Sequence, residues 1–229
     1  MLTLAVALCI AMAPLIAIGS DYDEILQNAL AELNNDYLDN WMFNEERIFD
    51  GVLTEAQYDP RLKDKWQLHS IQGKSPTPEE REKFVQEKIK ETMSDGKQKR
   101  RRDLKSLVSL KTLKLVEESE EHWLFDFVPD REGAEGQFMA LLHGELKISK
   151  QSLAIEYIDL RNDDIIKPRF GFRVDEFFSR IEFMRLKMAG PVVPSSIEFR
   201  IKAKALGMVN VCLLYTSPSP RDLSTSRMP

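Results

Sequence analysis

Over the second half of the chain, apolar and polar residues alternate in short segments. Such segments begin at Leu113, Trp123, Leu142 and Leu153, and the clearest covers residues 197–205, where apolar residues alternate with Glu, Arg and Lys. A period of two with one charged face is typical of a strand that covers a core on one side only. The connections between segments are short, which favours an antiparallel meander over crossover units.

The first half of the chain shows a helical period instead. Apolar residues recur at helical spacing over residues 21–41, and we interpret residues 20–64 as an N-terminal helical segment. Thr77, Pro78 and Glu80 form a capping-box sequence that predicts a helix near 77–93. A further short helix is expected near 103–110.

The two patterns together predict an α+β fold. We expect residues 65–211 to form a curved antiparallel sheet, an incomplete β-barrel, because a twisted sheet with one apolar face must curl to bury that face. The amphipathic helices are the available cover and are predicted to pack on its concave face.

The N-terminal stretch of residues 2–18 is apolar and free of charge, and Gly19 and Ser20 follow it. We interpret residues 1–19 as a secretory signal peptide, which predicts an exported protein. No Lys or Arg precedes the stretch, which a wrongly chosen start codon would explain. An uncleaved membrane anchor is the competing interpretation.

The C-terminal stretch has an unusual coding match. Residues 212–222 are what a common transposase-fragmentation sequencing adaptor encodes, and residues 226–229 match the flanking primer in the same frame. We therefore predict that residues 212–229 are an adaptor artefact and disordered, and that the native sequence, truncated there, stops near Val211. The strand at 197–205 would then end the sheet or be left as an exposed edge. A natural Ser/Pro tail would fit the composition but not the coding match.

Charge and cysteine content narrow the class of protein. Cys9 and Cys212 both fall outside the predicted mature chain, so its core must hold without disulfides. The formal net charge is −5, which argues against a nucleic-acid partner. A basic run could contact anionic headgroups at a membrane surface, or could be a solvated linker. Its residues are Lys97, Lys99, Arg100, Arg101 and Arg102.

No catalytic or metal-binding motif accompanies these patterns. His69, His122 and His143 are scattered, without a second ligand at metal spacing. Ser195 and Ser196 lack the flanking glycines of a nucleophile elbow. We therefore expect neither an enzyme nor a cofactor or metal site.

Several short phrases resemble a known superfamily. They are residues 123–129, 142–149, 155–160 and 190–194. Their strand rhythm is similar to that of the periplasmic outer-membrane lipoprotein-sorting (LolA/LolB/RseB-like) half-barrels, over about residues 113–211. The stretch from Trp66 to Thr77 resembles uncharacterised exported proteobacterial proteins, which implies an uncharacterised branch. Members share an incomplete antiparallel barrel whose apolar concave side accepts acyl chains or hydrophobic peptide.

This resemblance implies a periplasmic protein, exported across the inner membrane of a Gram-negative bacterium, that binds a lipid or a lipoprotein acyl chain in a preformed apolar cavity. The residues we expect to line the cavity are Trp123, Phe125, Phe127, Leu146, Ile148, Ile155, Tyr157, Phe199 and Ile201. The alternative is that these residues fill a closed core. The protein would then be a regulatory or assembly module of the envelope that binds a protein partner.

Overall fold

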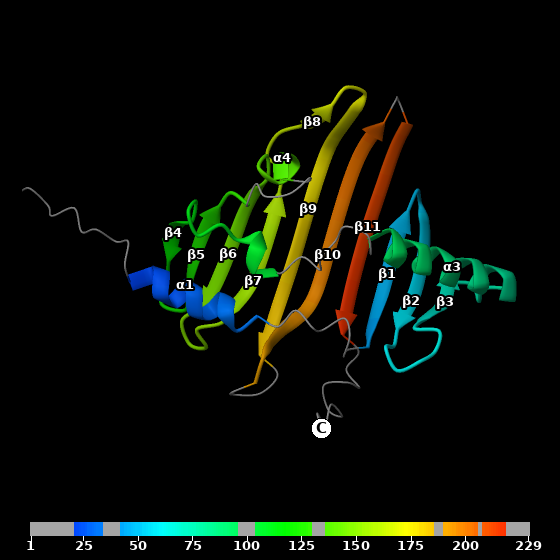
Figure 1. Ribbon diagram of the computed structural model, residues 1–229, viewed down its shortest axis with the longest axis horizontal. Coiled ribbons are helices and arrows are strands. Elements are labelled where there is room, and N and C mark those ends of the chain that lie inside the picture. The colour runs from blue at the N-terminus through cyan, green and yellow to red at the C-terminus, as the bar shows by residue number, and fades with distance from the viewer. Residues whose placement is uncertain are drawn as a thin grey trace, which may run out of the picture.

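The computed structural model describes residues 21–33, 42–95, 104–129, 136–185, 190–205 and 208–218. The strands of these residues form one antiparallel sheet in the order β3-β2-β1-β11-β10-β9-β7-β6-β5-β4, and β8 pairs with β9 beside it (Figure 1). Among the described residues, β3 and β4 each pair on one side only. The sheet is therefore not closed, and the fold class of an antiparallel sheet with helices is confirmed.

The central strands are the longest. The first group of strands is β1 (Phe43–Phe49), β2 (Val52–Tyr58), β3 (Trp66–Ile71), β4 (Lys114–Glu118), β5 (His122–Phe127) and β6 (His143–Ser149). The second group is β7 (Ile155–Arg161), β8 (Ile166–Arg169), β9 (Phe172–Arg185), β10 (Val192–Ala205) and β11 (Met208–Pro218). The helices are α1 (Asp21–Ala31), α3 (Pro78–Asp95), α4 (Gly136–Met139) and the 3-10 turn η1 (Leu104–Leu107).

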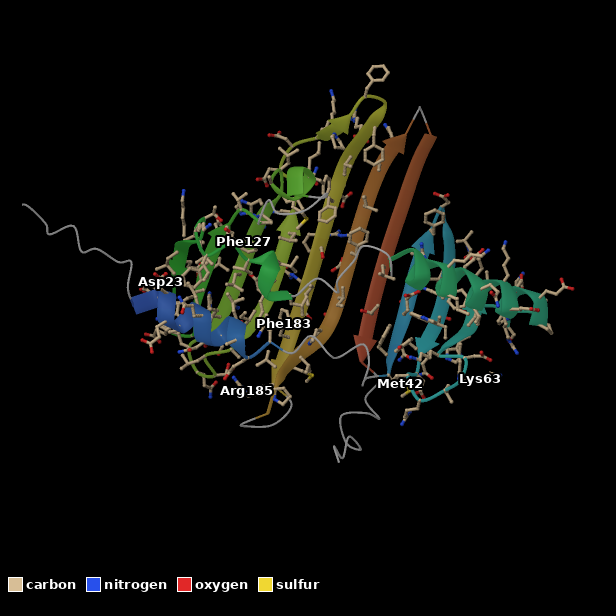
Figure 2. The ribbon with its side chains drawn as sticks, in the orientation of Figure 1. Asp23, Met42, Lys63, Phe127, Phe183 and Arg185 are labelled. Carbon is tan, nitrogen blue, oxygen red and sulfur yellow. The ribbon has the colours of Figure 1, made fainter. Side chains whose placement is uncertain are left out.

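Helix α1 closes the core over β5, β6 and β7. Leu26, Ala29 and Leu30 repeat at helical spacing, and all three are buried in one cluster with the apolar face of these strands. Figure 2 labels Phe127 on this side of the sheet. Its ring lies over Gly144 of β6, where any Cβ would collide with the ring. The glycine is thus required by the close packing of its neighbour.

Helix α3 begins as the capping-box sequence predicts. The Thr77 amide donates to Glu80 Oε2 at 2.8 Å, and the Glu80 amide donates to Thr77 Oγ1 at 3.3 Å. The helix then packs on β3, with the Phe84 ring edge-on to the Trp66 ring at 6.3 Å between centroids.

Both helices contact the same face of the sheet. Side chains of directly paired residues on neighbouring strands point to the same side, so one row can be followed from β3 to β5. The row runs through Leu68, Ala56, Glu45, Thr216, Ile197, Ile181, Ile158, Leu146 and Phe125. Because α3 lies over the β3 end of this row and α1 over the β5 end, we call this side the helix-covered face.

The prediction that residues 212–229 are disordered is wrong for residues 212–218. These residues belong to β11, which lies between β1 and β10. The whole of β1 pairs with Cys212 to Pro218, and the strand at residues 197–205 is neither the end of the sheet nor an exposed edge. The run of Val, Leu, Tyr and Thr has high strand propensity whatever its coding origin. Residues 219–229 lie outside the described residues.

The prediction that residues 20–64 form a helical segment is also wrong in its second part. Within residues 20–64, α1 ends at Ala31, and β1 and β2 form a hairpin further on. The turn residues Asp50 and Gly51 have φ of 47° and 81°, as a two-residue hairpin turn requires. The predicted signal peptide at residues 1–19 and the basic run at residues 97–102 lie outside the described residues.

Candidate functional site

Most of the predicted cavity residues lie in a filled core beneath α1. Their side chains are at most 2% exposed and contact one another and the helix. They are Phe125, Phe127, Leu146, Ile148 and Ile155. Trp123 is half-buried at the margin of this core, with the Tyr22 ring of α1 edge-on at 6.3 Å. The structure thus brings these residues together as packing partners.

The assignment of Tyr157 to the cavity is wrong. Tyr157 pairs with Lys147, on the face opposite to the core, and its hydroxyl donates to Glu145 Oε1 at 2.7 Å. Burial of the ring raises the pKa of Tyr157, and the bond to Glu145 raises it further. A register shift between Lys147 and Ile148 explains the error, because the bulge interrupts the period of two after Ile155.

Phe199 and Ile201 lie on the helix-covered face outside the fully buried core, and Ile201 packs against its margin. Both side chains are half-buried on β10. The Phe199 ring contacts Phe177 at 5.4 Å between centroids, and Phe177 contacts Phe138 at 5.3 Å. We call Phe138, Phe177, Phe199 and Ile201 the central stripe. Phe138 comes from α4 and the other three from β9 and β10, which lie between the strands that α1 and α3 cover (Figure 1).

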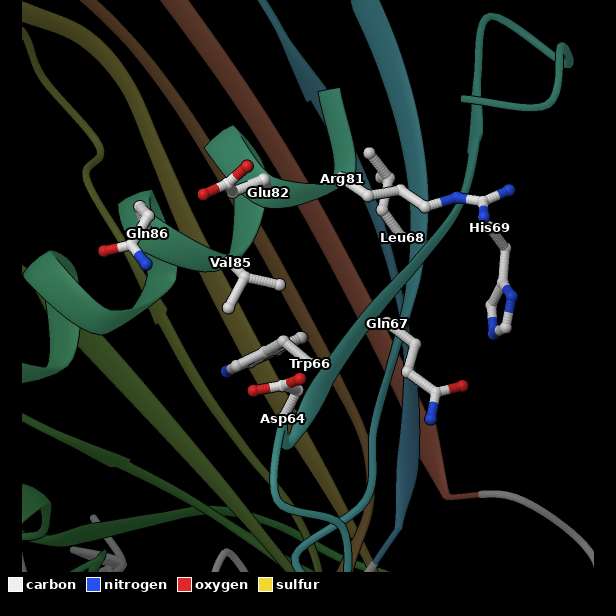
Figure 3. A pocket seen from close by; sticks show the side chains of 9 residues that line it. All are labelled: Asp64, Trp66, Gln67, Leu68, His69, Arg81, Glu82, Val85 and Gln86. Carbon is white, nitrogen blue, oxygen red and sulfur yellow. The ribbon is translucent and has the colours of Figure 1, made fainter. Parts of the chain in front are cut away.

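Sequence reasoning missed a cleft between α3 and β3. The cleft has a volume of about 670 Å³ and opens at the outer edge of the sheet (Figure 3). Its lining residues are Asp64, Trp66, Gln67, Leu68, His69, Arg81, Glu82, Val85 and Gln86. The capping box and the alternation around Trp66 predicted both walls, but nothing in the sequence indicated that the helix packs along the last strand.

A buried ion pair supports the inner wall of the cleft. Lys88 Nζ lies 2.7 Å from Glu45 Oε1 and 2.9 Å from Oε2, and both side chains are less than a tenth exposed. The ammonium group also lies 4.3 Å from the centroid of the Trp66 ring. A buried charge is tolerated only when it is paired. The position of α3 on the sheet is therefore tied to one geometry of Lys88.

The opposite face of the sheet is polar and internally paired. Arg180 Nε donates to Asp159 Oδ1 at 2.7 Å, and the guanidinium lies 4.5 Å from the Tyr157 ring centroid. The bond to Asp159 raises the pKa of Arg180. His143 Nε2 lies 3.2 Å from Asp126 Oδ1. Asp159 and Arg180 on this face thus match one another's charge.

In the part of the chain that the structure describes, no three His, Cys, Asp or Glu side chains are grouped to hold a metal ion. No helix among the described residues has both the length and the apolar character needed to cross a membrane.

Comparison with known proteins does not assign this chain to a family. No family model matches the chain, and no curated protein matches it. Two solved structures overlap with it: MucB in complex with MucA(peri), at a TM-score of 0.22, and the Pseudomonas aeruginosa MucA/MucB complex, at a TM-score of 0.24. Each is 11% identical and covers 86% of this chain and 94% of the matched chain. Superpositions with TM-scores this low carry no argument about family or function.

Proposed function

We propose that this chain is a non-catalytic module of the cell envelope that binds a protein partner, and that it holds no acyl chain in its core. The observation that carries the proposal is the filled core beneath α1. Five of the nine residues expected to line a lipid cavity belong, with Leu26, Ala29 and Leu30, to one buried cluster. Export rests on the apolar stretch at residues 2–18.

The energetics of the core favour this proposal. A lipid tail gains about 0.8 kcal/mol for each methylene it buries. To enter this core, the lipid tail would have to displace α1. The apolar side chains of α1 would then lose their burial. Each fully buried Leu, Ile or Phe side chain is worth about 1.5–3 kcal/mol, so the exchange yields little net gain.

A protein partner has surfaces available without such an exchange. The central stripe is half-exposed, and the α3–β3 cleft opens to solvent. We take the helix-covered face to be the concave side of the sheet, with the partner bound between and beside the helices. Aromatic residues in half-buried positions are typical of the centres of protein interfaces.

A second candidate function is binding of an acyl chain along the central stripe. The half-burial of Phe199 and Ile201, which the resemblance had assigned to ligand contact, favours it. In this case the lipid would lie on β9 and β10, and the core beneath α1 would stay closed.

One experiment separates the two functions. The chain is exported in a Gram-negative host with a photo-crosslinking phenylalanine at position 199, and with the same residue at position 178 on the polar face as the control. We expect a discrete protein adduct at 199 and none at 178, and native mass spectrometry of the unmodified chain should give the mass of the protein alone. Stoichiometric lipid that the Phe199→Ser variant no longer retains would replace the protein-binding proposal by the second function.

A further inference from the structure

We propose that the α3–β3 cleft binds an extended segment of the partner polypeptide, which adds as a strand to the outer edge of β3 beneath α3. This inference rests on the proposed function and names the site and the chemistry of the partner. The ligand class is a short, strand-forming peptide that carries an acidic side chain at one end and a basic side chain at the other.

The backbone of β3 supplies the first part of the argument. Asp59 N donates to Lys65 O at 2.8 Å, so the backbone groups of Lys65 point toward β2. The backbone N–H and C=O groups of successive residues point to opposite sides of a strand. Those of Trp66 and Leu68 therefore point away from β2. Among the described residues, β3 pairs with β2 alone. The outer edge of β3 thus offers donors and acceptors with strand geometry, which an extended polypeptide satisfies.

The side chains of the cleft supply the second part. Trp66 and Val85 are half-buried and face each other across the cleft, one from the strand and one from the helix (Figure 3). A strand that pairs with β3 would place alternate side chains beneath α3, against these two apolar residues. The volume of about 670 Å³ accommodates a few small aliphatic side chains with their backbone.

The charges of the cleft are separated along its length. Figure 3 shows the Arg81 side chain reaching from the first turn of α3 toward His69, whereas the Asp64 carboxylate lies beside Trp66 at the start of β3. In the part of the chain described, Arg81 makes no ion pair within the protein, and its side chain is exposed. This polarity is complementary to a peptide with an acidic residue near Arg81 and a basic residue near Asp64.

The same edge is protected against unlimited pairing. A bulge lies between Leu68 and Ser70, and Ile71 turns back to bond Lys74 in both directions at 3.0 Å. Bulges and tight turns of this kind limit how far a neighbour can extend along an edge strand. The accessible length is therefore that of a short peptide rather than of another sheet.

The test uses a synthetic peptide as the probe, acetylated and amidated, with the sequence Lys-Thr-Val-Thr-Val-Thr-Glu, in which Lys, both Val and Glu share one face of the strand. We expect amide hydrogen exchange at Trp66 and Leu68 to slow by about tenfold or more in millimolar peptide, because both N–H groups become bonded. Unchanged exchange at both amides under these conditions overturns the proposal.

Two variants with matched controls check the walls of the cleft. Arg81→Glu should weaken binding of the probe by about tenfold and strengthen binding of a peptide with its Lys and Glu exchanged, whereas Lys83→Glu, outside the cleft, should do neither. Val85→Trp should fill the cleft and abolish amide protection, while Ile89→Trp, which is one turn further and outside the lining, should preserve it. Equal effects of a variant and its control would count against the site.

Failure of this site can be distinguished from failure of the proposed function. A protein adduct at position 199 together with unprotected β3 amides leaves the module a protein binder and overturns only the strand-addition site. Protection of the β3 amides by the peptide supports the site directly, whatever the crosslinking at position 199 shows.

Discussion

The two ends of the helix-covered face are held by different chemistry. Beneath α1 the buried core is hydrocarbon, with Phe125 and Leu146 almost fully enclosed, and polar contacts such as Tyr22 to Glu118 lie at its margin. Beneath α3, an aromatic cluster surrounds the buried pair of Lys88 and Glu45. The members of this aromatic cluster are Phe43, Tyr58, Trp66 and Phe84. Figure 2 labels Phe127 on the first side and Met42 and Lys63 on the second.

This difference shows how one sheet can combine a core that stays closed with a second packed region that opens more readily. Apolar burial is non-directional and tolerates small shifts, so the α1 side stays closed. A buried ion pair is stable only in one geometry, because separation leaves an unpaired charge in an apolar site. Opening that hydrates both charges recovers their desolvation cost, so the α3 side should open at lower free energy than the α1 side, which suits the proposed peptide site.

Truncation after Val211 should have the largest effect on this comparison. It removes every residue of β11 that pairs with β1. Strands β1 to β3 and helix α3 then lose their attachment to the rest of the sheet. Hydrogen exchange with mass spectrometry should show lost protection over residues 42–95 and retained protection around β5 to β7. Truncation after Pro218 is the control and should leave both regions protected.

Phe125→Ala should come next, with a loss of about 3–5 kcal/mol in the free energy of unfolding, because it leaves a cavity in the closed core. Urea unfolding followed by circular dichroism measures it. Phe178→Ala on the polar face removes the same number of atoms from a half-exposed site and should cost about 1 kcal/mol. Similar losses in the two variants would show that the α1 side is not sealed.

Lys88→Met should cost about 3 kcal/mol, because Glu45 is left buried and unpaired. Replacing both residues by Met should recover most of this loss, since the apolar pair has no charge to desolvate. The comparison requires urea unfolding of the two single variants and the double variant. A double variant as unstable as Lys88→Met would mean that packing, not charge pairing, holds α3 in place.

Thr77→Ala should cost about 1 kcal/mol, because it removes the side-chain oxygen that caps α3. Exchange should accelerate in the first turn of α3 and stay unchanged in α1. Thr77→Ser keeps the capping hydroxyl and should behave as the parent chain does.

The smallest expected effect is on the pH dependence of stability. Burial and the bond to Glu145 raise the pKa of Tyr157 above its usual value of about 10. The folded state thus favours the neutral phenol, and this contribution is complete below about pH 10 and declines as pH rises above it. Tyr157→Phe should show a shallower loss of stability between about pH 10 and 11 in urea titrations. An identical slope in both proteins would contradict the assigned cause.

Local rules in the sequence predicted the parts of the fold that depend on local contacts. The capping box of Thr77 and Glu80 located the start of α3, and the alternation at Trp123, Phe125 and Phe127 located β5. The bulge beside Ile148 could not be predicted, because an extra residue in a strand leaves no compositional signal. Tyr157 was therefore placed on the wrong face.

Long-range strand pairing accounts for the remaining differences between the predicted and the observed fold. The partner of β1 lies near the other end of the chain, and its register depends on three strands that meet only in the folded sheet. The α3–β3 cleft likewise arises from how the helix packs along an edge strand. Patterns within a short window of sequence carry no information on either arrangement.

The position of β11 also has a consequence for the order of folding. Strand β1 is synthesised long before β11, so the edge of β1 that pairs with β11 stays unpaired until residues 212–218 have been made. Contacts so distant in sequence close slowly, because a long loop must be ordered before any pairing compensates for the lost entropy. During synthesis, the hairpin of β1 and β2 therefore exposes an unpaired strand edge that can misassociate until Cys212 to Pro218 have been made.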